Sequence, residues 1–253
     1  MKMFKKLLAL TLTLVLVVAC FAGCKKSDAL VVGITDFAPM DYKDDNGNWI
    51  GFDAEMATLF AESLGKEVEF VEIDWDNKAL EVDSDNIDCV WNGMTLTDEV
   101  KAAMDTSNPY CNNAQIVIVK KDVKDNYKTA ADCKKLKFAV EAGSAGKAQA
   151  EANKFDFVEV KDQATALMEV KAGTCDAAII DSLMAAAMVG EGTGYADLTY
   201  TVPLNSEEYG VGFKKGSDLT EKLNAFFKEC YENGKLQEIA KKYGVQASLI
   251  EQK

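Results

Sequence analysis

The chain has 253 residues, a formal net charge of −13 at pH 7, no histidine and, as the printed sequence shows, no arginine. Nucleic acid binds proteins through a basic face, so a chain this acidic is not expected to have a nucleic-acid partner. The lack of histidine excludes a Ser-His-Asp or Cys-His nucleophile and a His-containing zinc site, and the cysteines lack metal-ligand spacing. We therefore expect no metal and no cofactor.

The N-terminal segment has the pattern of an export signal. Three lysines precede an apolar run over residues 7–19, which is shorter than the roughly 20 residues of a membrane span. The run ends in Phe-Ala-Gly before Cys24, which resembles a bacterial lipobox. We predict a signal peptide over residues 1–23, lipidation of Cys24, a tether over 24–29, and a location on the outer face of the cytoplasmic membrane. Cys20 is a weaker lipidation candidate, and an uncleaved membrane anchor is the alternative.

The remaining cysteines do not form an obvious disulfide set. Five cysteines remain, and none are close enough for a CxxC pair: Cys89, Cys111, Cys133, Cys175 and Cys230. Of these, Cys89 and Cys175 lie inside apolar, strand-like runs. Free cysteine behaves as a small apolar residue, so we expect buried thiols, with one disulfide left open.

Strand and helix patterns alternate through the first half of the chain. Asn46-Gly47 predicts a hairpin, and Asp53 is expected to cap a helix that Gly65 ends. The expected strands cover residues 30–34, 68–73, 87–91 and 115–120, with further helices from Asn77 and after Thr97. This alternation predicts parallel sheets covered by helices, an α/β fold.

The second half repeats the alternation and adds helices at the end. Strands are expected over residues 138–140, 157–160 and 175–180, with helices after Ser144, over 163–172 behind a cap by Asp162, and from Ser182. The C-terminal helices exceed what a second unit needs. We therefore predict two hinged lobes, residues 30–120 plus 208–253 and residues 121–207, with a ligand cleft between them.

Five stretches in this order resemble the extracellular solute-binding proteins of polar amino-acid ABC importers, a family with a two-lobe, type II periplasmic-binding-protein-like fold. They span nearly all of the chain after the tether: residues 51–56 (GFDAEM), 88–99 followed by 107–110, 140–144 (VEAGS), 176–181 (DAAIID) and 234–244. The resemblance implies a monomer that captures a small amino acid or amine by hinge closure and delivers it to a permease.

The resemblance also implies site residues. Phe37 and Trp75 would be aromatic walls around the ligand side chain, and Asn92, Gly93 and Thr95 would offer main-chain and hydroxyl groups. Ser144, at the start of a helix, would present N–H groups to a carboxylate. Asp181 would bind the ligand ammonium as a charge-assisted pair. Each of these residues also has an ordinary structural interpretation, as a core aromatic or a helix cap.

The sequence departs from the family at two positions. Val100 stands where the family has an arginine that binds the ligand carboxylate, and Lys101 or Lys147 are the candidate substitutes. Glu141 stands where related proteins often carry a lysine or glutamine near the ligand side chain, and Asp36 is expected as a further acid near the cleft. A site with Asp36, Glu141 and Asp181 and no certain cation is net negative, so it favours a ligand that carries an amine.

Two other functions fit parts of the same pattern. The chain could be a ligand-binding sensor lipoprotein that reports to a partner, or a dehydratase-type enzyme on this fold, in which only carboxylates such as Glu141 and Asp181 are available for acid–base chemistry. We favour a binding protein that is not an enzyme.

Overall fold

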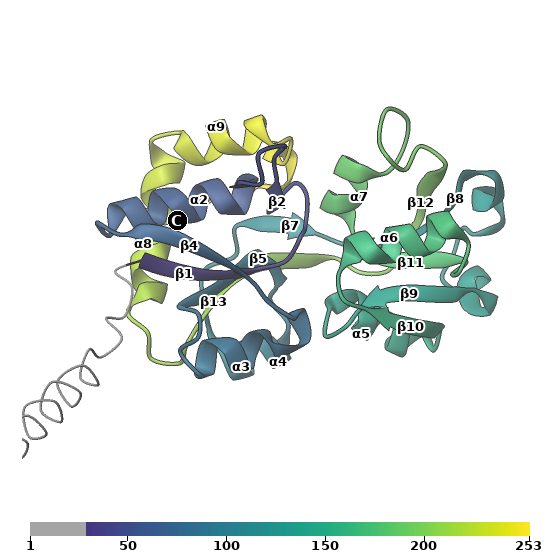
Figure 1. Cartoon of the computed structure of the whole chain (residues 1–253), viewed down its shortest axis with the longest axis horizontal. Coiled ribbons are helices and arrows are strands. Elements are labelled where there is room, and N and C mark those ends of the chain that lie inside the picture. The colour runs from purple at the N-terminus through teal and green to yellow at the C-terminus, as the bar shows by residue number, and fades with distance from the viewer. Residues whose placement is uncertain (1–28) are drawn as a thin grey trace, which may run out of the picture.

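The computed structural model describes residues 29–253. The predicted signal peptide and the lipidation site Cys24 lie outside the described residues. In the part that is described, no helix combines the length and the apolar character needed to cross a membrane. The described chain forms two α/β lobes that lie side by side (Figure 1).

The first lobe is built on a mixed sheet with strand order β4-β1-β5-β13-β6, and β7 also pairs with β13. The strands are β1 (Ala29–Ile34), β4 (Glu67–Glu72), β5 (Cys89–Thr95), β6 (Asp105–Thr106), β7 (Cys111–Asn113) and β13 (Glu207–Phe213). β4, β1 and β5 are parallel, as the alternating pattern predicts, whereas β13 is antiparallel to its neighbours. The sheet is mixed because β13 enters from the other lobe.

The second lobe has a five-stranded sheet with order β10-β9-β11-β8-β12. Its strands are β8 (Gln115–Lys120), β9 (Lys137–Glu141), β10 (Asp156–Val160), β11 (Ala177–Asp181) and β12 (Leu198–Pro203). The neighbouring strands β10, β9 and β11 pair in parallel, and β8 pairs antiparallel with β11 and with β12.

The lobe boundary expected at Lys120 is wrong. β8 pairs along its length with β11, so the chain crosses at Ala114, before this strand. It returns ahead of β13, whose first residue Glu207 pairs with Asn113. The two crossing segments lie together, because Leu204 N–H donates to Gln115 O over 2.8 Å. Polar residues flank a strand at both of its ends, so composition alone does not show which lobe the strand belongs to. The expected boundary was therefore placed after β8 instead of before it.

Helices cover both sides of each sheet (Figure 1). The helices of the first lobe are α2 (Phe52–Ser63), α3 (Lys78–Asp83), α4 (Asp98–Ala103), α8 (Leu219–Glu232) and α9 (Lys235–Lys242). Those of the second are α5 (Ala145–Asn153), α6 (Gln163–Ala172) and α7 (Ser182–Met188). The hairpin predicted at Asn46-Gly47 is confirmed as β2 (Tyr42–Lys43) paired with β3 (Trp49–Ile50).

The helix starts expected at Thr97, Ser144 and Asp162 are confirmed, because the side chain of each caps its helix with a hydrogen bond from a backbone N–H group. Thr97 accepts from Val100, Ser144 from Lys147 and Asp162 from Thr165, each three residues on. The cap expected at Asp53 is wrong, because Gly51 holds that position and Asp53 lies inside the first turn of α2 with its carboxylate directed inward.

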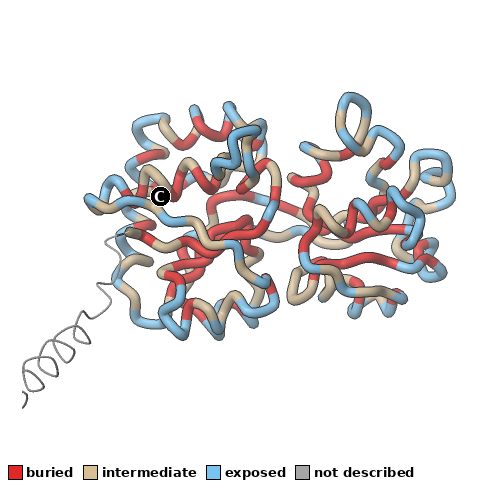
Figure 2. Tube along the Cα trace, in the orientation of Figure 1, coloured by how far each residue is buried: buried red, intermediate tan, exposed pale blue. Residues whose placement is uncertain are grey.

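The buried residues concentrate on the sheets and on the inner faces of the helices (Figure 2). In the first lobe Trp91 of β5 packs edge-on against Phe227 of α8, with ring centroids 5.5 Å apart, and Phe60 of α2 lies 6.2 Å from Trp91. The five cysteines of the described chain are buried and unpaired, as the sequence predicted.

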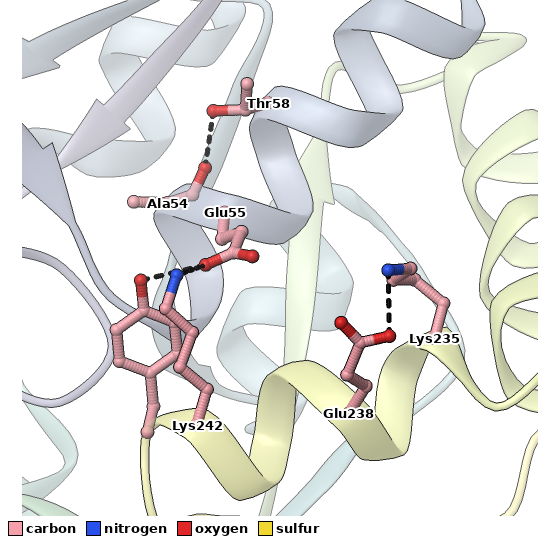
Figure 3. A network of polar contacts seen from close by, with 7 residues as sticks. Ala54, Glu55, Thr58, Lys235, Glu238 and Lys242 are labelled. Atoms are coloured by element: carbon pink, nitrogen blue, oxygen red, sulfur yellow. Dashed lines mark hydrogen bonds and ion pairs between the residues drawn. The ribbon is translucent and has the colours of Figure 1, made fainter.

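The C-terminal helix α9 is fixed to α2 of the first lobe by polar contacts (Figure 3). Glu55 accepts from Lys242 Nζ over 2.6 Å and from the Tyr243 hydroxyl over 2.9 Å. Lys235 and Glu238 form a further pair along α9 at 2.8 Å. The end of the chain therefore packs on the lobe that contains its first strand.

Candidate ligand-binding site

A cavity of about 510 Å³ lies between the two lobes. Its lining includes seven of the residues expected at the site, from both lobes: Trp75, Asn92, Gly93, Thr95, Glu141, Ser144 and Asp181. The carboxyl ends of β5, β9 and β11 all open into it, which is where α/β sheets bind ligands. These seven residues, spread over more than a hundred positions of sequence, are brought together by the two sheets.

Phe37 and Asp36 do not line this cavity. The side chain of Phe37 is buried behind the wall of the site, where a Cβ added to Gly93 would lie 2.3 Å from its ring. Phe37 forms a backbone bridge with Asp41, and its ring lies edge-on to Tyr209, with 6.3 Å between centroids. Asp36, the preceding residue, is exposed instead. The aromatic wall expected at Phe37 and the acid expected at Asp36 are therefore not part of the cavity lining.

The wall formed by β5 is shaped by a buried acid. Gly93 adopts φ +56°, and its N–H donates to Asp53 Oδ2 over 2.7 Å. The Tyr110 hydroxyl donates to the same oxygen over 2.7 Å. Burial raises the pKa of Asp53 to about 7. The acid of the 51–56 stretch therefore holds the backbone of this wall in place. Asn92, Gly93 and Thr95 belong to strand β5, which extends beyond the end expected at residue 91.

Asp181 is buried in a shell of donors from four other positions. Its Oδ1 accepts from Asn113, from Gln115 Nε2 over 2.9 Å and from the Tyr209 hydroxyl over 2.6 Å, and its Oδ2 accepts from Gln163. No side-chain cap bond to α7 is present, although Asp181 is the N-cap residue. Burial, and then the charge of Glu207, raise the pKa of Asp181 to about 8. Oδ1 is saturated, so Oδ2 is the oxygen with capacity left for a ligand.

Glu207 is a residue of this network that sequence reasoning missed. Its Oε1 accepts from Thr95 Oγ1 over 2.9 Å, from Asn113 Nδ2 over 2.7 Å and from Gln115 Nε2 over 2.8 Å. Thr95 lies in the first lobe and Gln115 in the second, so Glu207 ties both to the crossing segment. A polar residue at a hinge has no local sequence signature, and only the pairing of β13 with β7 reveals its place.

Glu141, at the end of β9, has an oxygen available for a ligand. The residue is 3 % exposed, and Oε1 has no hydrogen-bond partner among the described residues. Burial, and then the charge of Asp181, raise the pKa of Glu141 to about 8. A buried acceptor without a donor is unfavourable, so a ligand that donates there is stabilised.

The cavity also holds a cation that sequence reasoning missed. Six acids line it: Asp76, Asp98, Glu99, Glu141, Glu151 and Asp181. Two lysines accompany them. Lys147 pairs with Glu159 over 3.1 Å, whereas the half-buried Lys78 Nζ donates to the Trp75 carbonyl over 3.1 Å and to the Gly143 carbonyl over 2.8 Å. The expected acidic excess is present, but the site is not without a cation.

Two α/β lobes joined by adjacent crossing segments, with a polar cavity between them, define the two-lobe, type II class of solute-binding proteins. The model of the bacterial extracellular solute-binding proteins, family 3, matches residues 30–246, and the chain belongs to this family.

The chain is also similar in sequence to individual relatives over most of their length. The chain is 31% identical to the arginine-binding extracellular protein ArtP of Bacillus subtilis, over 88% of this chain and 87% of ArtP. It is 30% identical to the L-cystine-binding protein TcyJ of Escherichia coli K12, over 87% of this chain and 84% of TcyJ. A crystal structure of the P235GK mutant of ArgBP from T. maritima superposes with a TM-score of 0.80 at 32% identity, covering 85% of this chain and 95% of that one.

Proposed function

We propose that the chain is the lipid-anchored, extracellular binding component of an ABC importer, and that it captures an amino acid whose side chain carries a donor or a positive charge. The lobes close on the ligand, and the closed form delivers it to a permease. The arginine-binding and cystine-binding relatives support an amino acid as the ligand class.

The acidic lining of the cavity carries the proposal. Glu141 presents a buried, unpartnered oxygen, and Oδ2 of Asp181 has capacity left beside it. A cationic or donor-rich group at this position satisfies Glu141 and lowers the electrostatic cost of two buried acids. An acidic side chain would place a third carboxyl group in the same space, where burial already disfavours the charged form of the other two.

Trp75, Thr95 and Ser144 are proposed to complete the binding site. Trp75 is the aromatic wall, and the first turn of α5, behind Ser144, offers N–H groups to a carboxylate. Thr95 contributes its main chain, because its hydroxyl already donates to Glu207. Since these residues come from both lobes, a ligand that contacts them all favours the closed form by its differential affinity.

We also propose that the chain has no catalytic activity. The sequence lacks histidine, and the relatives described above are named as binding proteins. The monomeric state and the anchor at Cys24 belong to the same proposal. Labelling of wild type and Cys24→Ser with a fatty-acid analogue tests the anchor.

The test of ligand class is a thermal-shift screen of the mature protein against the twenty amino acids, followed by calorimetry. We expect the largest shifts from basic or amide-bearing amino acids, and a loss of the preference for basic ones in Glu141→Gln. Scattering with the best ligand should show a more compact particle. Tightest binding to L-glutamate or L-aspartate would refute the charge argument.

A further inference from the structure

The family's carboxylate-binding arginine has no equivalent at its own position in this chain. Val100 occupies that position, is 8 % exposed and packs among apolar residues such as Met104 and Val90. Both Val100 and Met104 line the cavity, so this part of the site is apolar. Since the sequence contains no arginine, any cation that binds a ligand carboxylate must be a lysine.

Three lysines are candidates for binding a ligand carboxylate: Lys78, Lys101 and Lys147. The ammonium groups of the last two are poorly placed for this role. Lys101, on α4, is exposed and does not line the cavity. Lys147 lines it, but its ammonium is paired with Glu159 over 3.1 Å. Both substitutes that the sequence suggested are therefore poorly placed. The third, Lys78, lies at the start of α3, directly after the short 3-10 turn Trp75–Asn77.

The ammonium of Lys78 is held at the cavity by neutral groups. Its two hydrogen bonds are to the carbonyls of Trp75 and Gly143, and the ammonium lies 5.0 Å from the centroid of the Trp75 ring. Lys78 forms no ion pair with any residue in the described range. An ammonium has three donors, so one remains for a ligand, and its charge has no anion in contact. Burial lowers the pKa of Lys78, so an anion that binds it also stabilises its charged form.

The position of Lys78 coincides with the N-terminus of α5. Gly143, whose carbonyl it contacts, immediately precedes the N-cap Ser144 of this nine-residue helix. Of the first N–H groups of α5, Lys147 N–H is bonded to Ser144 Oγ, while those of Ala145 and Gly146 have no intrahelical acceptor. A carboxylate in front of this turn would therefore meet helix N–H groups and an ammonium together. The unpartnered Oε1 of Glu141, in the same cavity, independently indicates that a ligand belongs there.

We propose that Lys78 replaces the missing arginine as the residue that binds the ligand carboxylate, together with the first turn of α5. The proposal rests on the proposed function and deepens it, because it assigns the side chain that binds the α-carboxylate of the amino acid. It also explains how the carboxylate contributes to closure, because Lys78 belongs to the first lobe and Gly143 to the second. Lysine is a point charge rather than a planar fork, so the helix N–H groups supply the directionality.

Removing the carboxylate from the ligand and the ammonium from the protein tests this pairing. Calorimetry is done on wild type, Lys78→Met and the control Lys101→Met with three pairs of probes: L-arginine and agmatine, L-histidine and histamine, L-cystine and cystamine. In wild type we expect an amino acid to bind at least tenfold tighter than its decarboxylated partner. Lys78→Met removes the bond to the Gly143 carbonyl for both ligands, so the carboxylate role is measured by the difference: binding of the amino acid should weaken about 10- to 150-fold more than binding of the amine, as expected for a hydrogen bond to a charged group. Lys101→Met should match wild type.

The outcomes separate this inference from the proposed function. Equal losses for amino acid and amine, or no loss, in Lys78→Met would overturn the carboxylate role while leaving amino-acid capture intact. A wild type that binds only the amines would overturn both the carboxylate role and the proposed amino-acid ligand class. A wild type that binds none of the six probes or other amino acids would instead refute the proposed function. Where Lys78→Met fails to fold, as judged by its melting curve, Lys78→Gln is measured with the same probes, with the same losses expected.

Discussion

The contact between the lobes at Gly143 leaves no room for a side chain. Gly143 adopts φ +66°, and a Cβ at this position would lie 2.5 Å from Asp76 Oδ1 and 2.6 Å from Asp76 Cα, in the opposite lobe. Carbon atoms pack best at about 3.5–4.0 Å, so in Gly143→Ala the lobes must separate by about 1 Å at this contact. The neighbouring bond from Lys78 to Gly143 O, now 2.8 Å, would then be lost.

The expected magnitude follows from that bond. A hydrogen bond to a charged group contributes about 1.5–3 kcal/mol, so Gly143→Ala should weaken ligand binding about 10- to 150-fold. The left-handed backbone costs alanine a further roughly 1–2 kcal/mol, which lowers stability in both the open and the closed form. Gly65→Ala is the matched control, because Gly65 has φ +69° and its added Cβ would meet nothing within 4 Å.

Calorimetry measures the affinity, and urea denaturation measures the stability. Both variants should lose similar stability, but only Gly143→Ala should lose affinity and remain extended in solution scattering with saturating amino acid. If Gly143→Ala binds as tightly as Gly65→Ala, the contact with Asp76 does not limit closure and the reasoning is refuted.

Three further predictions concern the acids and the core. Burial raises the pKa of Glu141 from 4.5 to about 8, so the contribution of this group to the stability of the ligand-free protein should be full below about pH 4.5 and be lost as the pH rises through 8, by up to about 1.4 kcal/mol per pH unit. Melting temperatures measured from pH 5 to 9 should therefore depend less on pH in Glu141→Gln than in wild type. Equal slopes in the two proteins would contradict the assignment. Asp181→Ala should cost about 2–5 kcal/mol of stability in urea denaturation, since the hydroxyl of Tyr209 loses its buried acceptor, and a loss below 1 kcal/mol would show that the shell relaxes. Phe227→Ala should lower the free energy of unfolding by about 3–5 kcal/mol, because the ring packs on Trp91 in the core. Glu55→Gln, which removes a partly exposed ion pair, should lower it by less than about 1 kcal/mol. Similar losses in both variants would contradict this division between core and surface.

The polar shell around Asp181 changes how the sequence motif is interpreted. The residue was expected mainly as a ligand for an ammonium, yet three donors already occupy Oδ1. Asp181 therefore also holds the crossing segments together, through Asn113 and Gln115. Glu141, which the sequence placed near the ligand side chain only by resemblance, has the more available oxygen.

The sequence by itself determined the features that depend on neighbours a few positions away. The caps at Thr97, Ser144 and Asp162 each bind the N–H three residues on, so their side chains and the helix starts they mark are fixed locally. The alternation of strands and helices likewise predicted two α/β units. The family stretches then predicted which strand ends meet at the cleft.

Only the tertiary structure decided the contacts between distant residues. Lys78 lies 65 positions from Gly143, and nothing in the sequence around either residue indicates that an ammonium and a carbonyl meet across the cleft. The assignment of β8 to the second lobe depends on its pairing with β11, and the inward turn of Phe37 depends on the space above Gly93. Partner choice between strands and the direction of a side chain at a hinge are set by packing over the whole chain, which local composition does not encode.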